Sequence, residues 1–168
     1  SFDELITITN SEDGKKFFLG FAHVINAMRK CPKIIICRVH GKAIGGGVGI
    51  AAAADYCMAT NYGTIKLSEL ALGIGPFVIG PAVERKIGLS AFSQLALNAT
   101  EWQTAIWAKE KGLYHEVFDS IEQLDAYVDE LSQRLAATSS SALLALKQAL
   151  WHDTQHWDQL LEERAGIS

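Results

Sequence analysis

The sequence predicts an α/β fold whose last third is helical, and three observations lead to this prediction. Residues 34–39 are mostly β-branched, and this run and the run at 55–59 both have the length of a buried strand. Between them, a run of glycines leads into four alanines, and such small side chains let a helix pack closely against a sheet. The chain beyond residue 120 repeats apolar side chains at helical spacing. An order of strand, loop, helix and strand is typical of α/β architecture.

The first long element is predicted to be an amphipathic helix over about residues 12–30. Ser11 suits an N-cap, and the two acidic residues after it suit the positive end of the helix dipole. Apolar side chains recur at helical spacing at Phe17, Phe18, Phe21, Val24, Ile25 and Met28. Two basic residues and Pro32 then mark the end of the helix.

The strand at 34–39 is followed by a predicted loop at residues 40–44, the glycine run and a helix at 50–54. The stretch 68–77 holds too many Gly and Pro residues for a regular helix, so we interpret it as a loop that forms part of a site. Beyond Gly80 the chain is predicted to be helical, apart from one short strand at about residues 114–118.

A capping box opens the clearest of these later helices. Ser120 and Gln123 have the required spacing, and a single apolar stripe follows, made of Ile121, Leu124, Val128, Leu131 and Leu135. We divide the chain into an α/β core over residues 1–100 and a helical region over 101–168. Helices of this kind need a surface to cover them, which is either the sheet half of the chain or a neighbouring subunit, so self-association is one expectation.

Composition and charge restrict the function classes. The 168 residues are 49% hydrophobic and 20% charged, which is typical of a globular protein and not of a disordered one. Fifteen Lys and Arg against nineteen Asp and Glu leave a formal net charge of -4, which does not favour nucleic acid or an anionic membrane as a partner. The longest uncharged stretch is shorter than the roughly 20 apolar residues of a membrane span. Three cysteines without a CxxC motif favour reduced thiols and a cytoplasmic location.

The glycine run is the first candidate for chemistry. Backbone N–H groups at the start of a helix are unpaired, and the helix dipole favours an anion or a developing oxyanion there. Residues 47–52 also fit a loose GxGxxA dinucleotide pattern, but no acidic residue follows at the distance that ribose recognition requires. A nicotinamide dehydrogenase is therefore disfavoured. A tight turn that serves only helix packing is the alternative without a function.

Glu69 is the second candidate, because it is an acid among Leu67, Leu70 and Leu72 in a segment with little other charge. Burial in such surroundings would raise its pKa toward the range that suits proton transfer at neutral pH. The alternative is a partly exposed carboxylate with a structural role.

Four separated motifs occur in register. They are Val-His-Gly-Lys-Ala-Ile-Gly-Gly-Gly at 39–47, Asp55, Ser-Glu-Leu-Ala-Leu-Gly at 68–73 and the segment 100–112. Over nearly the whole chain they resemble the crotonase superfamily of enoyl-CoA hydratases and isomerases, and the similarity is greatest to the methylglutaconyl-CoA hydratase branch. By this resemblance the chain is a piece that lacks the family's N-terminal strands and its last helix.

The resemblance implies a partial spiral core of ββα units and a C-terminal helical trimerisation region. It also implies a homotrimer or hexamer that binds an acyl-CoA substrate, with no metal and no cofactor beyond the coenzyme A of that substrate. In the family, two backbone N–H groups polarise the thioester oxygen and stabilise an enolate. One would belong to Gly46 and the other to the residue before Ser1.

The resemblance also assigns roles to side chains. The family's second catalytic glutamate falls on Glu69, and the implied substrate-binding positions are Ala43, Gly45, Gly49, Pro76 and Phe77. Gly49 stands where typical hydratases have their first catalytic glutamate, and it has no group to titrate.

Three functions stay open from the sequence. Hydration of the 2,3-double bond is favoured, because the methylglutaconyl-CoA branch tolerates glycine at the position of Gly49. A 3,2-enoyl-CoA isomerase that uses Glu69 alone is the close alternative, and Pro76-Phe77 favours it. A non-catalytic CoA-binding or assembly module is the alternative from another class.

Overall fold

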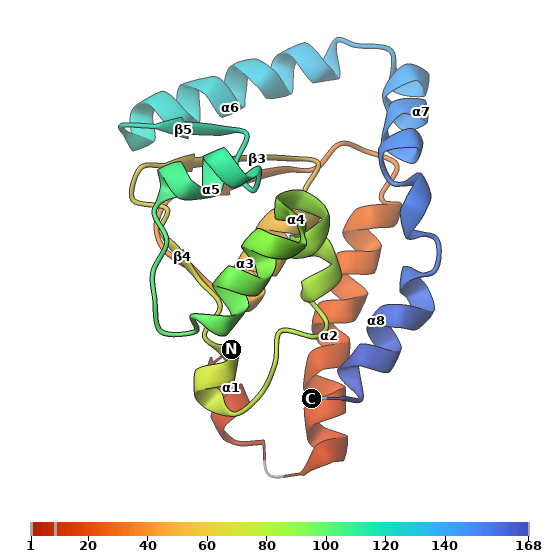
Figure 1. The fold of residues 1–168 in the computed structure, drawn as a ribbon. Helices are drawn as coiled ribbons and strands as arrows, with labels where there is room; N and C mark the ends of the chain where they lie inside the picture. The colour runs from red at the N-terminus through yellow and green to blue at the C-terminus, as the bar shows by residue number, and fades with distance from the viewer. Residues whose placement is uncertain (1, 9, 168) are drawn as a thin grey trace.

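The structure is a computed structural model that describes residues 2–8 and 10–167, and it confirms a mixed α/β fold (Figure 1). Within this part of the chain the strands form two parallel sheets. The larger sheet has the order β1 (Ile36–Val39), β3 (Tyr56–Thr60) and β5 (Glu116–Phe118). The smaller sheet pairs β2 (Ala43–Ile44) with β4 (Ile65–Lys66).

The strand–strand–helix order occurs twice. β1 and β2 lead into α3 (Gly46–Ala53), and β3 and β4 lead through the short 3-10 helix η1 (Glu69–Leu72) into α4 (Gly80–Leu97). This order agrees with the ββα core that was expected. The sequence interpretation missed β2 and β4, because strands of two residues are too short to show an alternating pattern.

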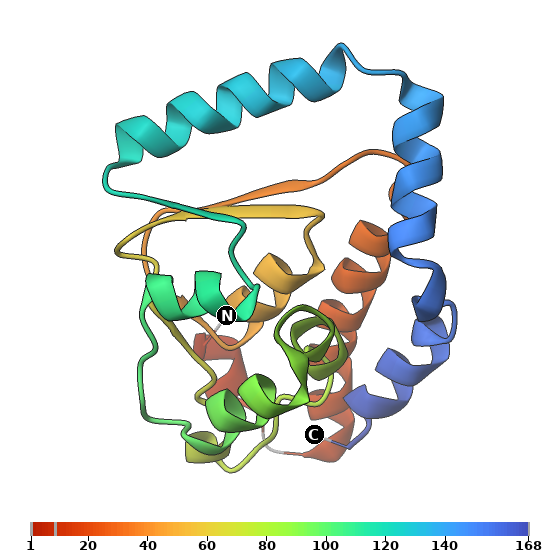
Figure 2. The same cartoon turned by 45° about the horizontal axis from the view of Figure 1, so that its top comes forward.

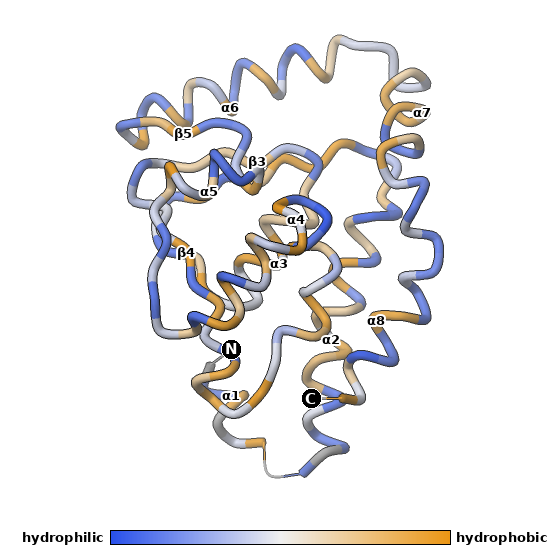
Figure 3. Tube along the Cα trace, in the orientation of Figure 1, coloured by the Kyte–Doolittle hydropathy of each residue, from blue (hydrophilic) through white to orange (hydrophobic). Residues whose placement is uncertain are grey.

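Helices cover both faces of the larger sheet (Figures 1 and 2). α6 (Ile121–Ala136) crosses one face, where Leu124 and Leu131 pack in one cluster with Met58 of β3. Figure 3 shows hydrophilic and hydrophobic residues alternating along this helix, as the predicted stripe requires. On the other face, Cys57 and Ala59 belong to the main core with α2, α3 and α4. Successive residues of β3 therefore face opposite helical layers, which explains why the strand is apolar on both sides.

The predicted first helix is α2 (Ser11–Lys30), and only its cap differs from the prediction. Asn10 is the N-cap, and its side-chain oxygen accepts a hydrogen bond of 2.8 Å from the Asp13 N–H. The remaining helices of the described residues are α1 (Phe2–Ile6), α5 (Ala105–Lys111), α7 (Ser140–Leu150), η2 (His152–Thr154) and α8 (Trp157–Ala165). α8 lies beside α2 in both ribbon views.

A buried ion pair ties α7 to the strands. The ammonium of Lys147, whose side chain is 3% exposed, lies 2.9 Å from Oδ2 of Asp55, just before β3. Asp55 also accepts hydrogen bonds from the Ile35 N–H at 2.7 Å and from the Trp151 indole N–H at 2.8 Å. Each charge therefore has an ionic partner, and the Asp55 carboxylate has additional donors, as burial of charge requires.

Among the described residues, no helix combines the length and the apolar composition needed to cross a membrane.

β5, which comes from the region 101–168, joins the same sheet as β1 and β3. The division of the chain at residue 100 stays a prediction.

Candidate active site

The glycine run forms the first turn of α3. We predicted a helix from residue 50, but the helix begins at Gly46, so the glycines lie within it. Gly45 precedes it with φ 55° and ψ -115°, a conformation with positive φ that is accessible to glycine and strained for other residues. The carbonyl of Gly45 accepts the N–H groups of Val48 at 2.9 Å and Gly49 at 3.2 Å.

The N–H groups of Gly46 and Gly47 come before these two bonds. Neither donates to a carbonyl of the described residues, as is usual for the first turn of a helix. A polar atom placed next to Gly46 would meet a backbone donor and the positive end of the helix dipole.

Glu69 occupies the first position of η1, within the segment that was predicted to be irregular. Gly73 ends this turn in a left-handed conformation with φ 78°, and the Ile74 N–H donates to the Glu69 carbonyl at 3.1 Å. The residue is 8% exposed, which agrees with the buried alternative and not with a partly exposed carboxylate. Burial raises the pKa of the Glu69 carboxyl above its ordinary value, and a hydrogen bond from its own backbone opposes this only in part.

The carboxylate lies directly against the start of the glycine run. An ideal Cβ placed on Gly45 would be 2.8 Å from Oε1 of Glu69, so only glycine lets the carboxylate approach this closely. The other oxygen, Oε2, is buried and has no hydrogen-bond partner among the residues that the structure describes. A buried acceptor without a donor is costly, and such atoms in native proteins often have a functional reason.

One small cavity joins Glu69 to Gly46. Its volume is about 30 Å³, and it is lined by Phe18, Phe21, Gly46, Glu69, Gly75, Pro76, Phe77, Val78 and Ile79. Four of the predicted site residues thus meet in one place: the acid, the helix start and the two residues at 76–77. The walls are otherwise apolar, and this accounts for the desolvation of the carboxylate.

The other predicted positions do not line this cavity. Gly45 lies against the Glu69 carboxylate, and Ala43 is buried in β2, where its N–H donates to the Thr64 carbonyl at 2.9 Å. Gly49 faces Ile79. The donor expected before Ser1 and Ser1 itself lie outside the described residues.

The sequence interpretation missed Phe18 and Phe21 as members of the site. Both fit the apolar stripe of α2, and nothing in their local sequence indicates that they reach the glycine run. The contact is a consequence of how α2 packs on α3. The residues after Phe77 were also missed, although Gly75 and Pro76 marked that segment as irregular.

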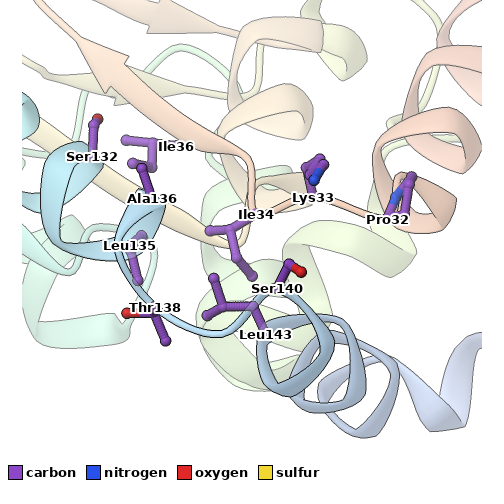
Figure 4. A pocket seen from close by; sticks show the side chains of 10 residues that line it. All are labelled: Pro32, Lys33, Ile34, Ile36, Ser132, Leu135, Ala136, Thr138, Ser140 and Leu143. Carbon is purple, nitrogen blue, oxygen red and sulfur yellow. The ribbon is translucent and has the colours of Figure 1, made fainter.

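A second hollow of about 410 Å³ lies where α6 and α7 meet the chain that enters β1 (Figure 4). Its walls are mostly small or aliphatic, and Figure 4 shows Ile34, Leu135 and Leu143 around it. No carboxylic acid and no histidine is among its lining residues, and its titratable side chain is that of Lys33. In the described part of the chain, no group of three or more His, Cys, Asp or Glu side chains could hold a metal ion.

The contact between Gly49 and Ile79 gives a first prediction. An ideal Cβ on Gly49 would lie 2.4 Å from Cγ2 and 2.6 Å from Cβ of Ile79, so Gly49→Ala is expected to lower the free energy of unfolding by about 1–3 kcal/mol. Gly47→Ala is the matched control, because its Cβ would meet only Ala43 at 3.8 Å. Urea unfolding measures both. Equal stability of the two variants would contradict the close contact.

Comparison with known proteins places the chain among enoyl-CoA hydratases and isomerases. Residues 5–166 match the sequence profile of the enoyl-CoA hydratase/isomerase family. The chain is 30% identical over 145 residues to a peroxisomal Delta(3,5)-Delta(2,4)-dienoyl-CoA isomerase of Arabidopsis thaliana, covering 84% of this chain and 51% of that protein. It is 31% identical over 133 residues to an enoyl-CoA hydratase of Alternaria alternata, covering 78% of this chain and 44% of that protein.

Solved structures show the same fold. An enoyl-CoA hydratase/isomerase from Marinobacter aquaeolei superimposes with a TM-score of 0.81 at 26% identity, covering 98% of this chain and 65% of the other. The chain spans about half the length of the curated relatives it matches. Hydratases and isomerases occur among them at nearly equal identity, so the similarity does not choose between the two reactions.

Proposed function

The chain belongs to the enoyl-CoA hydratase/isomerase family, and from this premise we propose that it acts on an unsaturated acyl-CoA thioester through an enolate, with Glu69 as the acid–base group. The observation that carries the proposal is the buried Glu69 carboxyl group, which lines one cavity with the N-terminal turn of α3 and whose Oε2 has no hydrogen-bond partner among the described residues.

The two parts of the cavity suit the two needs of enolate chemistry. The Gly46 N–H, at the positive end of a helix dipole, would stabilise the charge that grows on the thioester oxygen, and such a donor contributes about 10²- to 10³-fold in rate. The Glu69 carboxylate would remove the proton, and its raised pKa makes it a stronger base than an exposed glutamate. Among the described residues no hydrogen bond to Oε2 would compete with a substrate proton.

Within the family's two reactions, the geometry favours isomerisation of a 3-enoyl to a 2-enoyl thioester. The carboxylate of Glu69 would take a proton from C2, the electrons would move to the thioester oxygen as a dienolate, and the same proton would return to C4. One acid suffices for this cycle. At Gly49, where hydratases carry a second acid, Ile79 occupies the space of a side chain. We therefore propose isomerisation, and the hydration that the sequence favours stays a prediction.

Hydration remains the second candidate because of one observation. The cavity of about 30 Å³ is large enough for a single water molecule. Such a water would have the Glu69 oxygen and a backbone N–H as polar partners, and Glu69 could then serve both to activate the water and to protonate C2.

The activity of the whole protein, its acyl-CoA substrate and a trimeric or hexameric assembly are proposals that rest on the family. The nearer relation to the methylglutaconyl-CoA branch also stays a prediction.

The test is to add the full-length protein separately to 3-hexenoyl-CoA and to 2-hexenoyl-CoA and to follow the absorbance of the conjugated thioester. We expect an increase with 3-hexenoyl-CoA, because the double bond moves into conjugation, and little decrease with 2-hexenoyl-CoA. A decrease with 2-hexenoyl-CoA and no reaction of 3-hexenoyl-CoA would favour hydration. No change with either substrate would favour a non-catalytic CoA-binding module.

A further inference from the structure

Cys37 and Cys57 occupy matched positions on neighbouring strands. In the parallel pair of β1 with β3 the two residues are register partners, and both side chains pack on the main core, so they extend from the same face of the sheet. Adjacent strands lie about 4.8 Å apart, and a disulfide needs Cα atoms about 4.4–6.8 Å apart. The spacing of the two strands therefore suits a bond between these cysteines.

The two thiols interact with each other and differ in their access to solvent. Cys57 is 0% exposed, whereas Cys37 is partly exposed. The thiol of Cys57 donates a hydrogen bond to the sulfur of Cys37. A small oxidant from solution would therefore reach Cys37 first, and a second sulfur lies directly beside it.

Lys86 of α4 brings a positive charge near both thiols. Its ammonium donates to the Ala54 carbonyl at 2.9 Å, just before β3, and its side chain lines an open hollow of about 520 Å³. The hydrogen bond from Cys57 lowers the pKa of Cys37 and the charge of Lys86 lowers it further, while burial opposes both. Because the thiolate is the form that reacts with oxidants, these surroundings favour reaction at Cys37.

We propose that Cys37 and Cys57 form a modification site, at which hydrogen peroxide converts the thiol pair into a reversible disulfide between β1 and β3. The inference is independent of the reaction at Glu69. The disulfide would enclose residues 38–56, which include β2 and the glycine run. It would thus join covalently the two ends of the segment that carries Gly46.

The oxidation takes place in two balanced steps. The Cys37 thiolate attacks one oxygen of the peroxide, so an S–O bond forms, the O–O bond breaks, and the leaving hydroxide takes the proton that Cys37 gave up and becomes water. The Cys57 sulfur then attacks the sulfur of this sulfenic acid, so the S–S bond forms, the S–O bond breaks, and the hydroxide leaves with the Cys57 proton as a second water. The thiol pair loses two electrons, and the peroxide gains them.

The experiment treats the full-length protein with hydrogen peroxide, removes the excess with catalase and examines the product by mass spectrometry. We expect the intact mass to fall by the mass of two hydrogen atoms. Proteolysis without reductant should then give a linked pair of peptides that contain positions 37 and 57, and dithiothreitol should separate them. This readout needs no variant and no turnover.

Single alanine variants distinguish the roles of the two sulfurs. Cys37→Ala is expected to form no cross-link and to keep Cys57 as a thiol, because Cys57 is buried. Cys57→Ala should also form no cross-link, but its Cys37 sulfenic acid has no partner sulfur and should react with dimedone to at least about a threefold higher level than in the unmodified protein. Cys31→Ala is the matched control, since Cys31 ends α2 outside the sheet, and it should form the cross-link at an unchanged rate.

Lys86→Met is expected to slow formation of the cross-link by at least about threefold without changing the product, because it removes the positive charge that favours the Cys37 thiolate. Lys111→Met, at an exposed lysine, is the matched control and should keep the rate. Circular dichroism of each variant before oxidation shows whether it is folded.

A folded, unmodified protein that gives no linked peptide of positions 37 and 57 would overturn the proposal, and so would a cross-link that requires Cys31. Dimedone labelling of Cys57 in place of Cys37 would overturn the order of the two steps. A rate that Lys86→Met leaves unchanged would overturn the contribution of Lys86. None of these results depends on whether the hexenoyl-CoA substrates are converted, so failure of the thiol pair and failure of the proposed function are distinguishable.

Discussion

Glu69→Gln is expected to lower turnover of the full-length protein by at least about a hundredfold while thioester affinity stays within about threefold. The amide keeps the shape of the carboxyl group and cannot accept a substrate proton. The site is small and apolar, so no other acid is placed to replace it among the residues that line the cavity. Steady-state kinetics together with calorimetric binding of butyryl-CoA separate the loss of chemistry from a loss of binding.

Glu84→Gln is the matched control, because Glu84 is exposed on α4 and does not line the cavity. It should retain the turnover of the unmodified protein. If Glu69→Gln retained more than about a tenth of the turnover, Glu69 would not be the acid–base group.

The difference in stability between Glu69→Gln and the unmodified protein is expected to depend on pH. Because burial raises the pKa of Glu69 in the folded protein, the folded state binds its proton more tightly than the unfolded state does. The resulting stabilisation is present below the ordinary pKa of 4.5 and is lost as the pH rises through the raised value.

Glu69→Gln has no proton to lose, so it should be more stable than the unmodified protein at neutral pH. The difference should disappear at pH values below the ordinary range of a glutamate. Urea unfolding at several pH values measures this. A difference in stability that does not change with pH would contradict the burial of the charge.

Lys147→Met is expected to cost about 3–5 kcal/mol of unfolding free energy, because it leaves Asp55 buried without its cation. Lys147 is 2% exposed and Asp55 accepts from both Ile35 and Trp151, so water cannot easily replace the lost partner. Urea unfolding with an unchanged dependence on urea concentration would show that stability itself has changed.

The exposed pair between Lys30 and Asp158 supplies the control. Lys30→Met should cost less than about 1 kcal/mol, since exposed ion pairs contribute little. Adding Asp55→Asn to Lys147→Met should recover part of the loss by removing the unpaired charge. A cost for Lys147→Met as small as that for Lys30→Met would mean that the ion pair contributes little.

Strong periodic patterns made much of the fold predictable. The stripe of α6 and the apolar face of α2 each repeat over several turns, so their helices were identified nearly to the residue. The short strands β2 and β4 left no such pattern. Their pairing depends on the chain returning beside itself about 20 residues later, which no local window contains.

Some residues of the candidate site could be predicted from the sequence and others could not. Glu69 and Gly46 could be singled out because a lone acid and a glycine run have chemical consequences that are visible locally. Phe21 and Ile79 could not, because their importance lies in what they touch across the fold. The start of α3 was misplaced for a related reason: glycine is a poor helix former on average, but here the turn at Gly45 begins the helix directly.

Gly45 lies where the Glu69 carboxylate meets the start of α3. Its Cα lies against the Glu69 carboxylate, and its unusual φ angle sets the direction in which the next amide points. Glu69 belongs to η1 and Gly46 to α3, so the missing side chain at Gly45 determines how closely these two segments of the chain approach each other. A side chain at position 45 would push the Glu69 carboxylate away from the start of α3 and so alter the small cavity that the two segments line together.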